Sequence, residues 1–275
     1  MISLRTNMTS LIVQKNLAHA TAGLNRAIEQ MTTGYKLNHA KDNPANYAIM
    51  KQLERKLCSW EVAQDNMMMG IDMLDTASDN ADLISNHVSR IRDLCMQGVN
   101  GTYGEQSLNA IKLEVKARAE EINRIVDSTE YNGIKLFGEK DSDGNVIPKI
   151  LNLQIGIDGS ESSRISVKTS FDIEGLNKLS EIDITSQDSL KELDKIINSI
   201  SGYQVEIGSS QNRLEYALDY AETTTENITS SLSTIRDADI AKVSSDFIRY
   251  QILQQACATL LATANQMPSI ALQLL

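Results

Sequence analysis

The sequence predicts a mainly α-helical protein, an elongated antiparallel helical rod or coiled coil with a small β-hairpin region in mid-chain and with paired N- and C-terminal helices. Three observations predict this fold. Apolar residues keep helical spacing at both ends of the chain and over most of the rest. Aromatic residues make up only 4% of the sequence and prolines number three, a composition typical of long helices. The apolar period changes to two only near the middle, which predicts strands there.

The first helix is predicted to end at the Thr-Thr-Gly sequence of residues 32–34. Apolar residues recur along it at nearly heptad spacing, with alanines between them: Leu4, Leu11, Leu17, Leu24, Met31, Ala20 and Ala27. This spacing gives a helix one apolar seam, so we expect the helix to pair with another.

A much longer helix is predicted over residues 44–99, capped by Asp42 or Asn43 and with Pro44 at its first position. At about 1.5 Å per residue it would extend roughly 84 Å. A compact globule of this chain length has a radius of gyration of only about 19 Å. The helix therefore predicts a rod.

The middle of the chain is predicted to turn back twice. Glycines at residues 98–104 end the long helix, and helical spacing resumes over residues 105–128, which predicts an antiparallel return. The Asn132-Gly133 pair is typical of a β-turn, and apolar residues then alternate within residues 151–167. We expect a small hairpin region there.

The last part of the chain is predicted to be helical again, from about Ser186 for some fifty residues and then, beyond a joint capped by Asp237 or Asp239, to the C-terminus. In the final helix, apolar residues occupy every seventh position: Leu253, Leu260, Met267 and Leu274. Pro268 weakens this seam near its end. We expect the seam to meet the N-terminal helix.

Residues 251–275 contain no charged side chain. Exposed helix faces normally carry lysine and glutamate, and a buried charge would need a desolvated partner. The outer faces of this helix are therefore expected to be buried against other copies of the chain. The segment is too rich in glutamine to span a membrane.

The order of the elements is nearly a palindrome, so the two termini should lie together. It predicts three parts: residues 1–43 and residues 237–275 as the two halves of an inner coiled-coil domain, the first with a spoke, and residues 44–236 as a helical rod domain that includes a β-hairpin region at 130–175.

The charge and the reactive residues exclude several classes of function. The net charge is -10 and no local basic patch is apparent, which argues against nucleic-acid binding and membrane association. The cysteines are expected to be buried apolar residues, and the histidines are too scattered for a zinc site: Cys58, Cys95, Cys257, His19, His39 and His87. No catalytic residue, metal site or cofactor site is predicted, so the chain is not expected to be an enzyme.

Four stretches resemble bacterial flagellin: residues 16–49, 89–103, 128–137 and 244–275. The resemblance implies an extracellular filament subunit for motility, whose termini are disordered in the free subunit and fold on assembly. It implies export without a cleaved signal peptide through the flagellar type III apparatus. Implied partners are other copies of the chain, an export chaperone, and cap and hook-filament junction proteins. Only residues 135–185 are available for an outer domain, so none is expected.

The resemblance also implies binding to the flagellin-sensing Toll-like receptor, an innate immune receptor of the host. The family's motif matches Arg90, Leu94 and Glu114, with Leu94 expected as an apolar knob on the face of Arg90. Three residues depart from the usual pattern: Asp93, Cys95 and Met96.

Two other interpretations stay open. A hook-filament junction protein shares the terminal helices but does not polymerise. A signalling ligand or secreted adhesin would have lost the filament role altogether.

Overall fold

The computed structural model describes residues 7–137, 139–140, 146–147, 150–168, 179 and 182–273. Its helices are α1 (Met8–Thr33), α2 (Pro44–Val99), α3 (Glu105–Ser128), α4 (Gln187–Arg236) and α5 (Ile240–Gln273). All five helices were predicted from the sequence, and the mainly α-helical class is confirmed. The chain divides into two compact units, residues 1–57 with 226–275 and residues 58–225.

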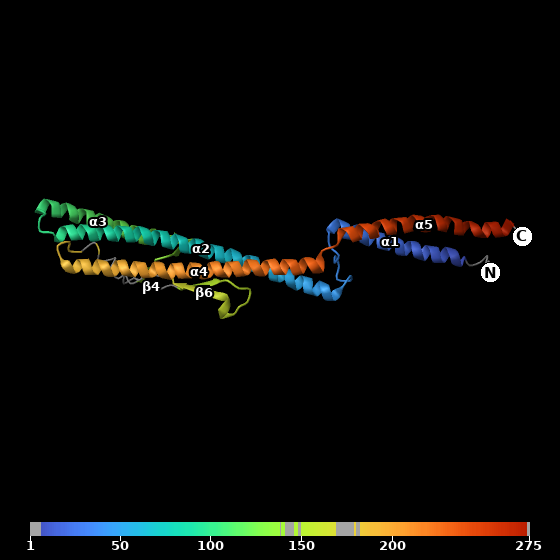
Figure 1. The fold of residues 1–275 in the computed structure, drawn as a ribbon, viewed down its shortest axis with the longest axis horizontal. Helices are drawn as coiled ribbons and strands as arrows, with labels where there is room; N and C mark the ends of the chain where they lie inside the picture. Colours follow the sequence, from blue (N-terminus) through green and yellow to red (C-terminus); the bar gives the residue numbers. More distant parts are fainter. Residues whose placement is uncertain are drawn as a thin grey trace. The chain divides into compact units, whose positions relative to one another are not determined.

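In the first unit the terminal helices α1 and α5 lie side by side and antiparallel (Figure 1). The Asn7 side-chain amide donates a hydrogen bond to the carbonyl of Ala264 at 2.7 Å, and the Gln254 amide donates to the Thr21 hydroxyl at 3.3 Å. The partners of later α1 residues lie earlier in α5, as an antiparallel pair requires. The predicted pairing of the two ends of the chain is confirmed.

Backbone hydrogen bonds join the end of α1 to the joint between α4 and α5. Gly34 has a φ of 75° and ends α1 in the left-handed conformation that glycine adopts readily. Its carbonyl accepts a hydrogen bond from the backbone N–H of Ala238 at 2.8 Å, and the N–H of Lys36 donates to the carbonyl of Arg236 at 2.8 Å. Asp239 caps α5, because its carboxylate accepts from the N–H of Ala241 at 3.0 Å.

The start of α2 also has a side-chain cap. Asn43 accepts a hydrogen bond from the backbone N–H of Asn46 at 3.1 Å. Asp42 instead accepts from the backbone N–H of His39 at 3.0 Å, within the preceding turn. Of the two predicted caps, Asn43 is therefore the residue that caps α2.

The second unit is built on α2, α3 and α4. Helices α2 and α4 are antiparallel, since Asp75 accepts from the Gln211 amide at 2.6 Å while Arg92 donates to Asp194 at 2.6 Å. The fully buried residues of this unit come from all three helices, from the segment directly after β2 and from two positions shortly before α4. The largest are Met67, Ile84, Ile91, Ile122, Leu136, Phe137, Leu179, Ile184, Leu193, Ile200 and Ile207.

Three two-stranded antiparallel sheets are described in mid-chain: β1 (Glu130–Tyr131) with β2 (Ile134–Lys135), β3 (Glu139–Lys140) with β4 (Val146–Ile147), and β5 (Ile150–Gln154) with β6 (Arg164–Lys168). The 3-10 helix η1 (Glu161–Ser163) precedes β6. Asn132 and Gly133 both have positive φ, at 49° and 77°, as the predicted Asn-Gly turn requires. Strand β5 ends at Gln154, before the end of the apolar alternation, because the chain turns toward η1 there.

Candidate functional site

The seam between α1 and α5 is a heptad seam in which small and large apolar residues are mixed. Side chains that are at least half-buried follow one another in α5 at spacings of four and three: Val243, Phe247, Tyr250, Gln254, Cys257, Leu261 and Ala264. The facing residues of α1 have the same spacing: Val13, Leu17, Ala20, Leu24 and Ala27. Both helices therefore present a regular apolar seam to each other.

The predicted seam of α5 is wrong by one residue. Leu253 and Leu260 are 44% and 54% exposed, and Leu11 of α1 is 53% exposed. Leucine gave the strongest periodic pattern, but close packing of the two backbones is possible only where one helix offers small side chains. Leu17 and Leu24 do lie in the seam.

Other predicted seam residues have different outcomes. Met31 is 40% exposed, outside the seam. Leu4 and Leu274 lie outside the described residues, and the side chain of Met267 is also outside what the structure describes.

Exposed apolar side chains also lie on the outer sides of α1 and α5, and we call them together the terminal apolar surface. It consists of exposed Met8, Leu11, Ile12, Ile28, Met31, Ile240, Ile248, Ile252, Leu253 and Leu260. Large exposed apolar surfaces of soluble proteins mark sites of interaction. The surface therefore leaves three leucines that are predicted to take part in self-association available to another molecule: Leu11, Leu253 and Leu260.

Arg90 and Glu114 meet at the surface between α2 and α3. The Arg90 Nε atom lies 3.7 Å from Glu114 Oε1, and Arg118 of α3 donates to the same oxygen at 3.0 Å. Side chains of Arg90 and Glu114 keep 47% and 40% exposure. The two predicted residues therefore form one accessible, partly ion-paired face.

Leu94 does not project from this face. Its side chain is only 2% exposed, so the expected apolar knob is wrong. One turn of an α-helix takes about 3.6 residues, so a residue four positions after Arg90 does not lie directly above it. This rotation turns the Leu94 side chain toward the core. By packing in the core, Leu94 can help to hold in place the part of α2 that carries Arg90.

The three departures from the usual motif are divided between core and surface. Cys95 is fully buried, and burial raises the pKa of its thiol to about 11, with Asp183 adding to the effect. Asp93 and Met96 are exposed. The Met96 sulfur accepts a hydrogen bond from Arg92 at 3.4 Å.

The remaining cysteines and histidines do not form a metal or binding site among the residues that the structure describes. Cys257 is buried in the seam, but Cys58 is exposed, so its predicted burial is wrong. His39 lies 2.8 Å from Glu29 and His19 is exposed. Within the residues that the structure describes, no group of histidine, cysteine and acidic side chains could hold a metal ion. No described helix is both long and apolar enough to cross a bilayer.

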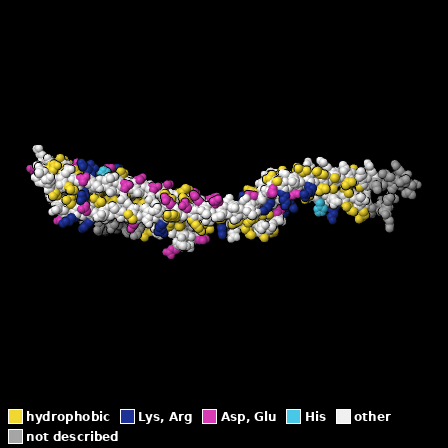
Figure 2. Space-filling model, in the orientation of Figure 1, with side chains coloured by type: hydrophobic (Ala, Val, Ile, Leu, Met, Phe, Trp, Pro, Cys, Tyr) yellow, Lys and Arg dark blue, Asp and Glu magenta, His cyan; other side chains and the backbone are white. Residues whose placement is uncertain are grey.

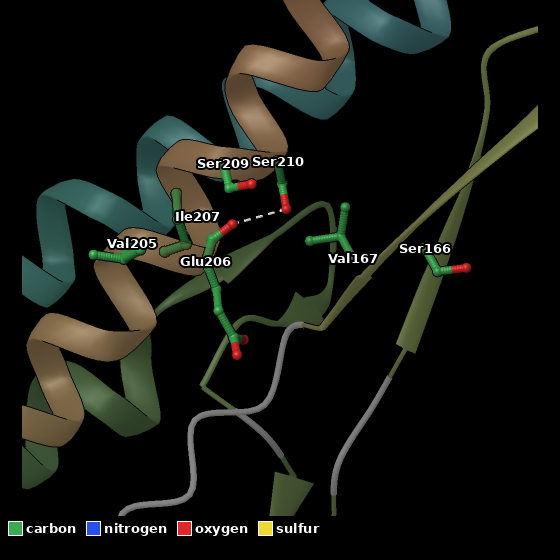
Figure 3. Close-up of a pocket in the computed structure, with 7 residues that line it drawn as sticks. All are labelled: Ser166, Val167, Val205, Glu206, Ile207, Ser209 and Ser210. Atoms are coloured by element: carbon green, nitrogen blue, oxygen red, sulfur yellow. Dashed lines mark hydrogen bonds between the residues drawn. The ribbon is translucent and has the colours of Figure 1, made fainter.

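A hollow of about 350 Å³ lies between β6 and α4 (Figure 3). Its lining is Ser166, Val167, Val205, Glu206, Ile207, Ser209 and Ser210. The Ser210 hydroxyl donates to the backbone carbonyl of Glu206 at 2.8 Å, which is an ordinary contact within a helix. The lining contains no nucleophile and base in contact, so the hollow indicates no catalytic chemistry.

Comparison with known proteins identifies the family. The family model for the bacterial flagellin N-terminal helical region matches residues 4–142, and that for the C-terminal helical region matches residues 190–275. A flagellin of Halalkalibacterium halodurans is 31% identical, over 96% of this chain and 100% of the relative. A flagellin of Bacillus subtilis is 29% identical, over 98% of both chains.

A solved structure shares the fold. The structure of a putative flagellar hook-associated protein from Vibrio parahaemolyticus has a TM-score of 0.58 and 14% identity, covering 71% of this chain and 100% of that one. The two family models and the flagellin relatives place the molecule among structural proteins of the flagellum and not among enzymes. The chain belongs to the bacterial flagellin family and is a structural subunit of the extracellular flagellar filament that serves motility.

Proposed function

We propose that the chain builds its filament by coupled folding and assembly, through the terminal apolar surface. The observation that carries this proposal is the exposure of Leu253 and Leu260 in a helix without charge beyond Tyr250. A single two-helix seam buries too little apolar area to hold α1 and α5 folded alone. Neighbouring copies would bury the second surface and supply the missing stabilisation.

A truncation tests this mechanism. Deleting residues 251–275 removes most of α5 and leaves the second unit intact. We expect the truncated protein to keep the circular dichroism of its helices in residues 58–225 and to form no filaments in seeded polymerisation. Filaments of normal length from the truncated protein would contradict the mechanism. A four-residue deletion within residues 169–178, outside both terminal helices, serves as the matched control.

We also propose that the face around Arg90 and Glu114 binds the flagellin-sensing Toll-like receptor. The supporting observation is that both charged side chains are accessible and lie 3.7 Å apart on two different helices. Arg118 holds Glu114 from the other side. A fixed, exposed arginine can form paired hydrogen bonds with a carboxylate on a receptor.

The decisive variants are Arg90→Ala and Glu114→Ala. Each should lower receptor-reporter activation by purified monomer about tenfold or more, since each removes a charged contact worth about 1.5–3 kcal/mol. The matched control is Arg124→Ala, which removes an ion-paired arginine elsewhere on α3. Equal activation by Arg90→Ala, Glu114→Ala and the control would contradict the proposal.

Leu94→Ala is a weaker test, because Leu94 is buried. Its truncation leaves a cavity that costs about 2–5 kcal/mol of folding stability. A loss of activation in this variant counts only if its thermal unfolding midpoint is measured alongside.

Export and partners complete the proposed function. We propose that the chain is exported unfolded, without a cleaved signal peptide, through the flagellar type III apparatus. A flagellar export chaperone would cover the terminal apolar surface before export, and cap and hook-filament junction proteins would meet it at the filament ends. In this function residues 1–43 and 237–275 form the inner tube, and residues 44–236 form the rod around it.

The alternative is a hook-filament junction protein, supported by the fold that the chain shares with the putative flagellar hook-associated protein from Vibrio parahaemolyticus. Electron microscopy of purified protein seeded to polymerise separates the two. Long filaments support the filament subunit, and protein that only caps seeds supports the alternative.

A further inference from the structure

The charges of the chain are divided unevenly along helix α2. Residues 58–89 contain six acidic side chains and no lysine or arginine: Glu61, Asp65, Asp72, Asp75, Asp79 and Asp82. We call these six residues the acidic face. The stretch of α4 beside it, residues 204–225, adds four acidic side chains against one arginine. This part of the second unit therefore carries a concentrated negative charge.

The acidic face is exposed, and it is not only acidic. All six carboxylates are exposed. Val62, Met69 and Leu83, spaced at multiples of seven, are also exposed and lie on the same side of the helix. Asp75 and Asp82 accept hydrogen bonds from Gln211 and Gln204, which carry no charge and leave the negative charge of the carboxylates in place. Figure 2 shows acidic side chains gathered along one stretch of the molecule.

A surface of opposite charge lies in the first unit. Residues 36–56 contain five basic side chains against two acidic ones: Lys36, Lys41, Lys51, Arg55 and Lys56. We call these five residues the basic segment. All five are exposed, as is the neighbouring Ile49. The total charge of -10 hides this local excess of positive charge, so the expectation that the chain has no local basic patch is wrong.

The two acidic residues of this segment are engaged locally. Asp42 accepts from the backbone N–H of His39, and Glu54 lies 2.8 Å from Lys51 and 3.8 Å from Arg236. One carboxylate is thus shared between two cations. Residues 36–56 therefore carry three more positive than negative side chains.

We propose that the acidic face of one copy docks against the basic segment of a second copy in the filament. This proposal rests on the filament role of the chain. The contact joins two different surfaces, and such heterologous contacts propagate into open helical filaments when the rotation does not close a ring. Opposite potentials also raise the association rate and reject wrong pairings. Exposed Ile49 on one surface and Val62 and Met69 on the other supply apolar contact.

Charge reversal on each surface gives a direct test with full-length protein. The quadruple variant Glu61→Lys/Asp65→Lys/Asp72→Lys/Asp79→Lys changes the acidic face from -6 to +2, so that both surfaces are positive. The double variant Lys41→Glu/Lys56→Glu changes residues 36–56 from +3 to -1, so that both surfaces are negative. Each should raise the critical concentration for seeded polymerisation at least about tenfold, because like charges then face each other. An equimolar mixture should polymerise near the wild-type critical concentration, since each variant complements the other.

The control is Glu105→Lys/Glu120→Lys/Asp188→Lys/Glu192→Lys, which makes the same charge change as the first variant at exposed sites of α3 and α4. It should polymerise like the wild type. Circular dichroism of each monomer checks that the variants fold. The proposal is overturned if either reversed variant polymerises like the wild type alone, or if the mixture polymerises no better than its components.

Discussion

The ring of Tyr250 in α5 lies directly against the backbone of Gly23 in α1. A Cβ atom added at Gly23 would come within 2.5 Å of the ring. Glycine is thus the residue that lets the two helices approach at this level, and Tyr250 fills the space that a larger side chain in α1 would occupy. The seam between the terminal helices is specified by this size match as well as by apolar spacing.

Gly23→Ala should weaken the pairing of α1 and α5. The ring of Tyr250 must shift, and overpacking of this kind costs about 1–3 kcal/mol. The expected result is a higher critical concentration for polymerisation, measured by sedimentation of filaments. Gly202→Ala is the control, because no atom lies within 4 Å of its added Cβ and the change favours a helix. Equal critical concentrations for the two variants would argue against a tight seam.

Gly98→Ala should destabilise the second unit. Its added Cβ would lie 2.6 Å from the backbone carbonyl oxygen of Ile184, which cannot rotate away as a flexible side chain could. We expect a loss of about 1–3 kcal/mol in the free energy of unfolding. Thermal unfolding of the monomer measures it, and an unchanged midpoint would mean that the chain at Ile184 moves freely.

The cysteines should differ sharply in reactivity. Cys58 is exposed, whereas Cys95 is fully buried with a pKa raised to about 11. Only the thiolate reacts with alkylating reagents, so Cys95 should stay unmodified at pH 8 while Cys58 is labelled. Mass spectrometry of peptides after brief alkylation of the monomer measures both. Fast labelling of Cys95 would show that the core of the second unit opens readily.

The joint beside α5 should depend on pH through Asp237. A hydrogen bond from Ser233 and the neighbouring Arg236 lower the pKa of this carboxylate. A lowered pKa in the folded state stabilises the joint above the unfolded pKa, and that contribution is lost as the pH falls through the folded value. Asp237→Asn should therefore lower the melting temperature of filaments at pH 7, and the difference from wild type should shrink as the pH falls below 3.8, the ordinary pKa of an aspartate. A difference that is constant with pH would contradict this role.

The sequence predicted the helices well because their limits depend on local chemistry. Asn43 with Pro44, Gly34 and Asp239 act within one turn of the chain, and each can be recognised without knowing what the helix packs against. The same holds for the turn at Asn132 and Gly133.

What the sequence could not predict depends on contacts between distant segments. Leucine dominates the apolar pattern and so predicts Leu253 for the seam, yet Tyr250 occupies it because Gly23 in α1 leaves room for its ring. Leu94 was placed at the surface by its spacing from Arg90, whereas the packing of three helices turns it inward. Such choices depend on the facing helix, which periodicity does not identify.

In the filament, the terminal apolar surface is expected to be buried between copies of the chain. A map of the filament polymerised from this protein, obtained by electron cryo-microscopy, tests it most directly. We expect Leu253 and Leu260 to contact α1 or α5 of a neighbouring copy, while Cys257 and Ala264 stay in the seam with α1 of their own copy. A map in which Leu253 and Leu260 face solvent would contradict it.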